Sequence, residues 1–263
     1  MVYKAEDVKL QRFVALKSLP DDVARRGRGG VPMNAFDLVI MSFVNRLADL
    51  AHRSPTIDGF VVLVSGNNFL KGGVVVAVIW WIWFRDEEKR QFVVVGVMTG
   101  FLGLVVARVL THVIFRVRPL NNPQLAFPIP CALSRKVFEG AGSFPSDHAV
   151  LFFALATGIF FASRRAGWLM FTYVSVVICL PRIYLGIHYP TDVLAGAAIG
   201  VGLACLFNLS AIRRPATIWA KRWADSEPAL FYPCFFLLTY QIVDLFEPLR
   251  AITGFFRHGG VCT

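Results

Sequence analysis

The stretch "SFPSDHAVLFFALATGIFFAS", residues 143–163, joins a short polar motif directly to an uncharged apolar run. A helix that crosses the hydrocarbon of a membrane needs about 20 apolar residues, because its backbone N–H and C=O groups must all be satisfied within the helix. The run from 146 to 163 therefore predicts a membrane-spanning helix. The motif in front of it places a titratable pair, Asp147 and His148, where that helix meets the membrane surface.

The rest of the chain is similarly apolar. Of its 263 residues 56% are hydrophobic and 17% charged, and the mean hydropathy is +0.58, which disfavours a soluble domain with buried core helices. The runs that qualify as spans are 69–84, 91–115, 146–163, 168–181, 193–212 and 229–246. Because Pro233 and Asp244 interrupt the last run, whether it spans stays open. We predict an all-α, polytopic transmembrane helical bundle of about five to six spans.

Basic residues predict the orientation of this bundle. On one side of the alternating spans, the turns at 85–90, 164–165 and 213–222 contain nine Lys and Arg residues. The positive-inside rule assigns those turns to the cytoplasm. The polar motif at 143–149 then faces outward. We expect a bacterial cytoplasmic (inner) membrane protein, multi-pass, with this motif on the periplasmic or exterior side.

The ends of the chain differ from its middle. We expect a polar basic N-terminal segment at 1–36, a surface tail or helix, followed by a membrane-embedded domain at 37–212. Residues 213–263 would form a cytoplasmic turn and an additional helix. Apolar residues at helical spacing in 36–51 predict a helix lying in the membrane interface. An additional span within 37–66 stays open, and so does the side on which the N-terminus lies.

Three polar stretches meet the predicted outer ends of the spans. They are "THVIFRVRP" (111–119), "SFPSDHA" (143–149) and "PRIYLGIHYPTDVLAG" (181–196). Pro145 suits a first helical position, so the N–H groups and dipole at the following helix start form an anion site. By parity of the spans, all three stretches come together on one membrane face.

This collection of side chains fits phosphate chemistry. Arginine forks match phosphate oxygens, and a helix N-terminus adds backbone donors. A histidine held in one tautomer by a carboxylate can attack phosphorus with its other nitrogen, while a second, protonated histidine gives its proton to the departing oxygen. The stretches therefore predict hydrolysis of a phosphate ester through a phosphohistidine, with no metal and no other cofactor.

The three stretches resemble the signature motifs of the type 2 phosphatidic acid phosphatase superfamily. Its pattern is Lys, six residues, Arg-Pro; then Pro-Ser-Gly-His; then Ser-Arg, five residues, His, three residues, Asp. The wording of "SFPSDHA" with "RIYLGIHYPTDVLAG" is similar to the undecaprenyl-diphosphate phosphatases of the bacitracin-resistance type. The resemblance covers about residues 37–210 and implies the helical bundle shared with vanadium haloperoxidases.

Carried over residue by residue, the resemblance implies a role for each motif position. His188 would be the nucleophile, Asp192 its orienting partner and His148 the general acid. The residues expected to bind the phosphoryl group are Arg118, Arg182, Ser146 and Asp147, with Arg116 and Arg108 as further candidates. The lysine position of the first motif is Thr111, and Pro181 stands where serine is usual. Either Arg108 or Arg116 could supply the missing charge.

The individual residues also allow simpler interpretations. Taken singly, each histidine, arginine or acid could be an interfacial anchor or a helix-end charge. The five cysteines show no metal-ligand spacing, and a disulfide between Cys131 and Cys262 stays open. The excess of Lys and Arg over Asp and Glu is explained by the cytoplasmic turns and by anionic lipid surfaces, so we do not expect a nucleic-acid partner.

Three functions remain. The first and preferred one is an outward-facing phosphatase that hydrolyses a polyprenyl diphosphate. The second keeps the chemistry and acts on phosphatidate, phosphatidylglycerophosphate or lipid A phosphates, including transfer to another acceptor. The third is a transporter, channel or scaffold that binds an anion without turnover. The expected partners are the lipid phosphate substrate and membrane lipids; the sequence does not predict the oligomeric state.

Overall fold

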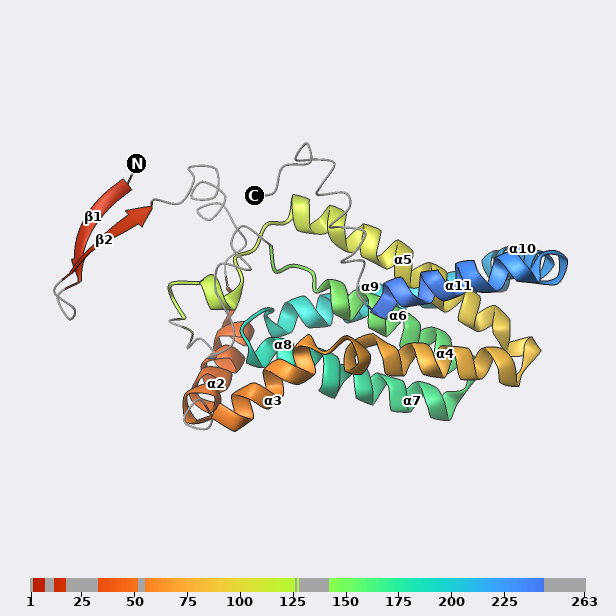
Figure 1. The fold of residues 1–263 in the computed structure, drawn as a ribbon, viewed down its shortest axis with the longest axis horizontal. Helices are drawn as coiled ribbons and strands as arrows, with labels where there is room; N and C mark the ends of the chain where they lie inside the picture. Colours follow the sequence, from red (N-terminus) through yellow and green to blue (C-terminus); the bar gives the residue numbers. More distant parts are fainter. Residues whose placement is uncertain are drawn as a thin grey trace.

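The computed structural model describes residues 2–7, 12–17, 33–51, 55–125, 127 and 142–243. Its main elements are helices, shown in Figure 1: α2 (Ala35–Ala51), α3 (Pro55–Gly66), α4 (Val74–Arg85), α5 (Arg90–Val113), α6 (Asp147–Ala162), α7 (Arg164–Tyr173), α8 (Leu180–Tyr184), α9 (Pro190–Phe207), α10 (Ser210–Ser226) and α11 (Pro228–Val243). Short π- or 3-10 segments join some of them: η1 (Phe69–Gly73), η2 (Glu87–Lys89), η3 (Pro119–Asn121) and η5 (Val174–Cys179). Cys131 and Cys262 lie outside the described residues, so their pairing stays a question.

The bundle confirms the predicted all-α, membrane-spanning fold. In the described part of the chain, three helical stretches are long and apolar enough to cross a membrane: Glu87–Val113, Arg164–Tyr184 and Pro190–Phe207. A fourth candidate is the pair Thr56–Gly66 and Phe69–Arg85, which is bent by 56°. Since α6 and α11 are also apolar but shorter, the total agrees roughly with the predicted number of spans.

Two segments depart from the sequence-based expectation. The N-terminal part, expected as a tail or helix, contains an antiparallel hairpin of β1 (Val2–Asp7) and β2 (Arg12–Lys17). The stretch at 213–222, expected as a cytoplasmic turn, lies within α10 and includes Pro215. The turn prediction is wrong there because charged residues interrupt the apolar run without interrupting the helix, whose Trp and Ile residues keep one side apolar.

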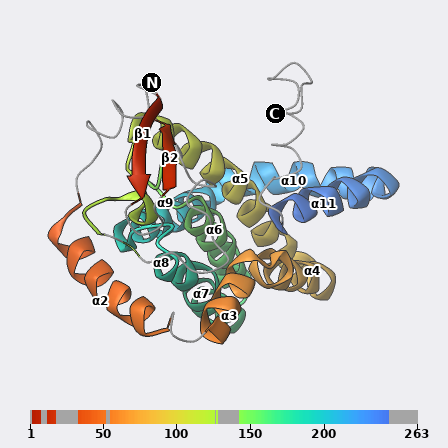
Figure 2. The ribbon, with the colours of Figure 1, turned by 60° about the vertical axis from the view of Figure 1, so that its left-hand side comes forward.

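Helix α6 lies at the centre of the bundle, between α5 and α9 (Figures 1 and 2). Ser146 caps its start, with the side-chain oxygen 3.5 Å from the backbone nitrogen of Ala149. Glycines let its neighbours approach closely. A Cβ on Gly200 of α9 would collide with the carbonyl oxygen of Val150, and one on Gly96 of α5 would lie 3.3 Å from the Cα of Gly158. This close packing fixes the relative positions of α5, α6 and α9.

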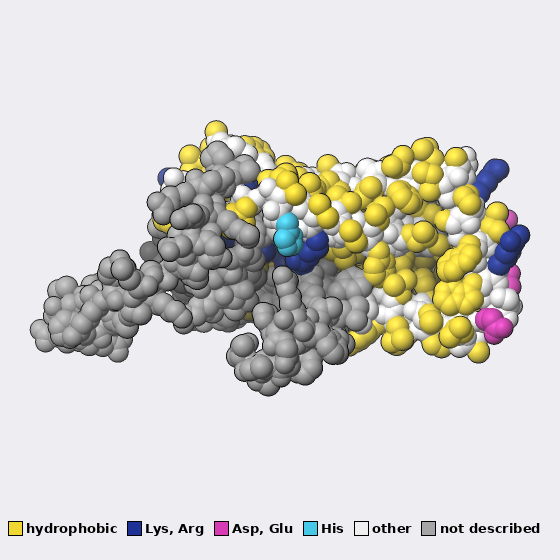
Figure 3. All heavy atoms as spheres, turned by 90° about the horizontal axis from the view of Figure 1, so that it is seen from above, with side chains coloured by type: hydrophobic (Ala, Val, Ile, Leu, Met, Phe, Trp, Pro, Cys, Tyr) yellow, Lys and Arg dark blue, Asp and Glu magenta, His cyan; other side chains and the backbone are white. Residues whose placement is uncertain are grey.

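The acidic residues seen at the surface and one group of basic residues lie at the end of the bundle away from the polar motifs. Figure 3 shows a broad hydrophobic surface, with Asp, Glu, Lys and Arg at one end and further basic side chains beside the histidine. The end with the acidic residues includes the α4–α5 turn, where Lys89 pairs with Asp86 at 2.9 Å. At the other end, the backbone N of Ser146 donates to the carbonyl of Asp192 at 3.1 Å, so the second and third motifs meet as predicted.

We predict that Gly200→Val destabilises the bundle. The side chain would strike the backbone of α6, and overpacking of this kind costs about 1–3 kcal/mol, or more where the backbone cannot move. The apparent unfolding temperature in detergent should fall by at least about 2 °C. Gly202→Val is the matched control, because a Cβ on Gly202 meets nothing within 4 Å. Equal unfolding temperatures for the two variants would contradict this account of the packing.

Candidate active site

A tight turn between α8 and α9 positions His188. The carbonyl of Arg182 accepts hydrogen bonds from the backbone N of Ile187 at 2.9 Å and of His188 at 3.3 Å. Gly186 within the turn has φ +66°, and a Cβ there would lie 2.9 Å from the ring of Phe127. Only glycine fits this position without strain. The turn therefore holds His188 rigidly at the end of the bundle.

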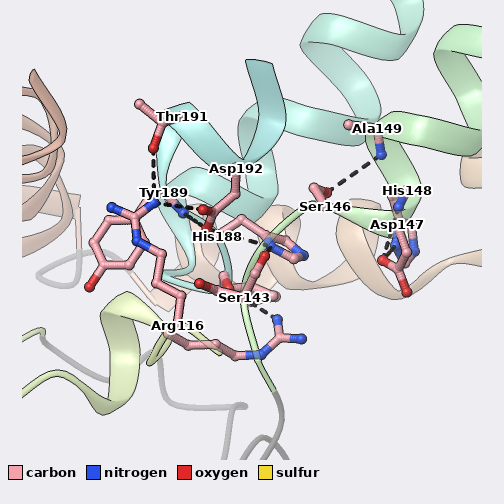
Figure 4. Close-up of polar contacts among 12 residues, drawn as sticks. Arg116, Ser143, Ser146, Asp147, His148, Ala149, His188, Tyr189, Thr191 and Asp192 are labelled. Carbon is pink, nitrogen blue, oxygen red and sulfur yellow. Dashed lines mark hydrogen bonds and ion pairs between the residues drawn. The ribbon is translucent and has the colours of Figure 1, made fainter. Parts of the chain in front are cut away.

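The hydrogen bond of His188 determines its tautomer. Its Nδ1 lies 2.8 Å from the carbonyl oxygen of Ser143, and the residue is 2% exposed. Because a carbonyl oxygen only accepts hydrogen bonds, Nδ1 carries the proton, and in the neutral ring Nε2 keeps its lone pair. Figure 4 shows His188 between the Asp192 and Arg116 group on one side and Asp147 and His148 on the other.

Asp192 lies close to His188 but makes its hydrogen bonds elsewhere. The Oδ2 of Asp192 is 4.0 Å from His188 Nδ1, beyond hydrogen-bond distance. That oxygen accepts from the backbone N of Tyr189 at 2.9 Å and so caps the start of α9. The other oxygen, Oδ1, accepts from Arg116 at 2.6 Å. The direct orienting partner of His188 in this structure is thus the Ser143 carbonyl, with the carboxylate behind it.

Arg116 belongs to a buried ionic cluster that sequence reasoning did not find. Its Nη2 donates to Asp37 of α2 at 2.6 Å, and its Nη1 contacts both Asp192 and the hydroxyl of Thr191. The guanidinium also lies over the ring of Tyr189, 3.9 Å from its centroid. Arg116 is 3% exposed and Asp37 is 0% exposed. Both terminal nitrogens of Arg116 thus bind carboxylates of the protein, while its Nε is buried with no hydrogen-bond partner among the described residues.

The α6 motif forms a second chain of contacts. His148 Nδ1 lies 2.9 Å from Asp147 Oδ1, and Asp147 Oδ2 pairs with Arg108 Nη2 at 3.1 Å. Arg108 therefore reaches the site from α5, while the hydroxyl of Thr111 bonds within its own helix to the carbonyl of Ala107 at 2.8 Å. Of the two arginines that sequence reasoning offered for the missing lysine, Arg108 is the one next to the motif and partly exposed.

Arg118 and Arg182 complete the candidate site. Arg118 donates from Nη1 to the carbonyl of Ile187 at 3.0 Å, which places it beside His188. Arg182 is 7% exposed. Within the described part of the chain, Nε of Arg182 and Nε2 of His148 are buried with no hydrogen-bond partner. Buried polar atoms are usually hydrogen-bonded, so these two nitrogens are available to a bound ligand.

Burial and the nearby cations change the acidity of the groups in these loops. Burial, and then the charge of Arg118, lower the pKa of His188 well below its ordinary value. Burial also lowers the pKa of Arg118, whereas for Arg116 the carboxylates of Asp192 and Asp37 outweigh burial and raise the pKa. His188 is therefore neutral at neutral pH, and both arginines are charged.

These features define a class of protein. An apolar helical bundle brings two histidines and four arginines to one end, and one of these arginines, Arg116, is neutralised by two carboxylates. Among the described residues, no cluster of His, Cys, Asp and Glu is arranged to hold a metal ion. The arrangement is that of a membrane-embedded enzyme for phosphoryl chemistry.

Comparison with known proteins identifies the family. Residues 91–215 match the PAP2 superfamily. Bacitracin transport permease protein BcrC of Bacillus licheniformis is 33% identical over 159 residues, 58% of this chain and 72% of that protein. Undecaprenyl-diphosphatase BcrC of Bacillus subtilis (strain 168) is 28% identical over 167 residues, 63% and 81% of the two chains. The chain belongs to the PAP2 superfamily, and it is a membrane protein and a hydrolase of the phosphatase class.

The fold comparison agrees with this assignment. The crystal structure of Aquifex aeolicus LpxE covers 67% of this chain and 97% of its own, with a TM-score of 0.50 and 20% sequence identity. The helical bundle predicted from the three motifs is thus confirmed at the level of the fold.

We predict that the imidazole of His188 stays neutral below the pH range in which an ordinary histidine becomes protonated. Its titration, followed by NMR of protein labelled with ¹⁵N-histidine in detergent, should have a midpoint clearly below the ordinary value of about 6.5. Arg118→Met should move that midpoint upward, because it removes a cation that disfavours the charged ring. The resonance is assigned by its loss in His188→Gln. A midpoint at or above 6.5 in the unaltered protein would contradict the structure.

Proposed function

We propose that this protein hydrolyses a lipid diphosphate at the outer face of the membrane through a phosphohistidine on His188, and that its substrate is undecaprenyl diphosphate. The observation that carries the mechanism is the hydrogen bond from His188 Nδ1 to the Ser143 carbonyl, because it leaves the lone pair on Nε2. The substrate is supported by the relative named undecaprenyl-diphosphatase. The outer face is supported by the cationic turns at the opposite end of the bundle.

The first half of the reaction forms the phosphoenzyme. His188 Nε2 attacks the terminal phosphorus, so a nitrogen–phosphorus bond forms while the bond to the bridging oxygen breaks. The leaving group is the lipid monophosphate, which takes a proton from His148. Arg118 and Arg182 bind the phosphoryl oxygens, and the N-terminus of α6, capped by Ser146, adds its dipole.

The second half releases phosphate. A water molecule attacks the phosphorus and returns its proton to His148, while the nitrogen–phosphorus bond breaks and the electron pair returns to Nε2. His148 can perform both steps because Asp147 binds its Nδ1 at 2.9 Å and stabilises the charged ring. Its Nε2, without a partner among the described residues, is then free to face the leaving oxygen. In this mechanism no metal or other cofactor takes part.

Arg108 takes the place of the absent motif lysine in this proposal. Its side chain is 46% exposed and already held against Asp147, so it can turn to a bound phosphate over a short distance. We predict that Arg108→Ala lowers kcat/KM by roughly 10-fold or more, since a charge-assisted hydrogen bond is worth about 1.5–3 kcal/mol. Arg108→Lys should recover part of the loss. Arg85→Ala, an exposed arginine at the opposite end, is the control, and equal activity of the two alanine variants would contradict this role.

The central test measures phosphate release from purified protein with undecaprenyl diphosphate, phosphatidate, phosphatidylglycerophosphate and lipid A, each with and without chelator. We expect release from undecaprenyl diphosphate, undiminished by chelator. His188→Gln should abolish it, by at least about 10³-fold, because no covalent intermediate can form. His112→Gln, an exposed histidine on α5, is the matched control and should keep activity.

Each other outcome of this test has a definite meaning. Rapid acid-free quenching with a ³²P-labelled terminal phosphate should trap a base-stable phosphoprotein in the unaltered chain and none in His188→Gln. Release of phosphate from glycerolipids or lipid A alone would show that the substrate is a different lipid phosphate, with the mechanism unchanged. No release from any lipid phosphate would support an anion-binding membrane protein. Loss of activity with chelator would contradict the metal-free reaction.

A further inference from the structure

The cluster of Asp37, Arg116 and Asp192 does more than neutralise buried charge. Arg116 is connected to the loop of His188 by two separate routes. Through its side chain it binds Asp192 at 2.6 Å and the hydroxyl of Thr191 at 2.9 Å, both at the start of α9. Through its backbone carbonyl it accepts from the N of Ser143 at 2.8 Å.

The second route ends on the imidazole itself. Ser143, held by the backbone of Arg116, offers its own carbonyl to His188 Nδ1 at 2.8 Å. The residue that fixes the tautomer of His188 is therefore positioned by Arg116. Asp192 lies four residues after His188, with its Oδ2 4.0 Å from the same Nδ1, so the first route holds a carboxylate beside the nitrogen that Ser143 binds.

Asp37 supplies the anchor for Arg116. It comes from α2, which packs against α8 and α9, and it is completely buried. Its carboxylate accepts from Arg116 Nη2 at 2.6 Å and from the backbone N of Thr191 at 3.0 Å, as well as from the hydroxyl of Thr191. Two carboxylates thus bind the two terminal nitrogens of one guanidinium. Removing either partner of an ion pair would leave a buried charge without compensation.

We propose that Asp37 and Arg116 are positioning residues for the reaction, which act on His188 through Ser143 and Asp192 without touching the substrate. The expected loss of kcat rests on the proposed function, whereas the expected change in the His188 tautomer rests on the contacts alone. Both terminal nitrogens of the guanidinium bind carboxylates at hydrogen-bond distance, which supports a role in positioning over direct binding of a phosphate. An arginine fork is required, because a lysine ammonium cannot span two carboxylates from different helices in this way.

The kinetic test compares variants that keep shape and lose charge. Asp37→Asn should lower kcat by roughly 10-fold and Arg116→Met by about 100-fold, with KM within about 2-fold, because a small displacement of a reacting group costs this much. Arg116→Lys should not restore kcat. In the double variant Asp37→Asn with Arg116→Met, kcat should equal that of Arg116→Met alone, since Asp37 acts through Arg116.

The control is a second buried aspartate. Asp58 on α3 is 2% exposed and accepts a hydrogen bond from the hydroxyl of Tyr184 at 3.0 Å. Asp58→Asn removes a comparable charge from a neighbouring helix, and kcat should stay within about 3-fold of the unaltered protein, as expected for a structural carboxylate outside the cluster. An equal loss of kcat in Asp58→Asn and Asp37→Asn, or a loss that appears in KM, would overturn the proposal.

A second measurement does not depend on turnover. The ¹⁵N resonances of the His188 ring report whether Nδ1 carries the proton. They should show one tautomer in the unaltered protein and in Asp58→Asn, and a mixture in Arg116→Met. A single, unchanged tautomer in Arg116→Met would refute the positioning role even if the protein released no phosphate from any lipid; that lack of release would separately refute the proposed function.

Discussion

The bond between the Nδ1 of His188 and the Ser143 carbonyl is the contact on which the candidate site depends. It joins the loop before α6 to the loop before α9, at 2.8 Å and out of contact with water. A carbonyl has no proton to exchange, so the tautomer it selects does not change with the protonation of a neighbour. A carboxylate in the same place would favour protonation of the ring, whereas burial and Arg118 keep the ring neutral.

This hydrogen bond requires that the backbones of the two motif loops be accurately placed. Close packing of the helices within the membrane provides that placement. Inside hydrocarbon the spans must be helices, and small residues allow them to pack with their backbones almost in contact. Gly196 and Gly200 of α9 both face the backbone at the start of α6, where a Cβ would collide with the carbonyls of Ser146 and Val150. The two motif loops therefore leave helices that are fixed relative to each other, so the loops themselves can be short.

The helices and part of the candidate site were predictable from the sequence. The same physical reasons explain which contacts were not predictable. The spans at 69–84, 91–115 and 146–163 match helices because the length of an apolar run is set by the bilayer. The spacing within the third motif predicted that His188 lies near Asp192. No sequence spacing of this kind predicts that the Ser143 carbonyl and Asp37 belong to the site. A backbone carbonyl can come from any residue type, so no sequence motif marks the Ser143 acceptor. Asp37 lies 79 residues from Arg116, in a helix whose apolar pattern predicted only a position in the membrane interface.

The charge balance of the site explains why an aspartate can replace the usual glycine before His148. Arg108, Arg118 and Arg182 bring three cations to one end of an apolar bundle, which is costly without a counter-charge. Asp147 supplies one, and its pairing with Arg108 keeps that side chain in place while the site is empty of substrate. A dianionic phosphate that enters the site offers Arg108 a stronger partner, so the arginine can change partners while Asp147 keeps its bond to His148. In the proposed mechanism the carboxylate would have two tasks, one for each oxygen: Oδ2 would hold Arg108 ready for the substrate, and Oδ1 would stabilise the protonated imidazole of His148.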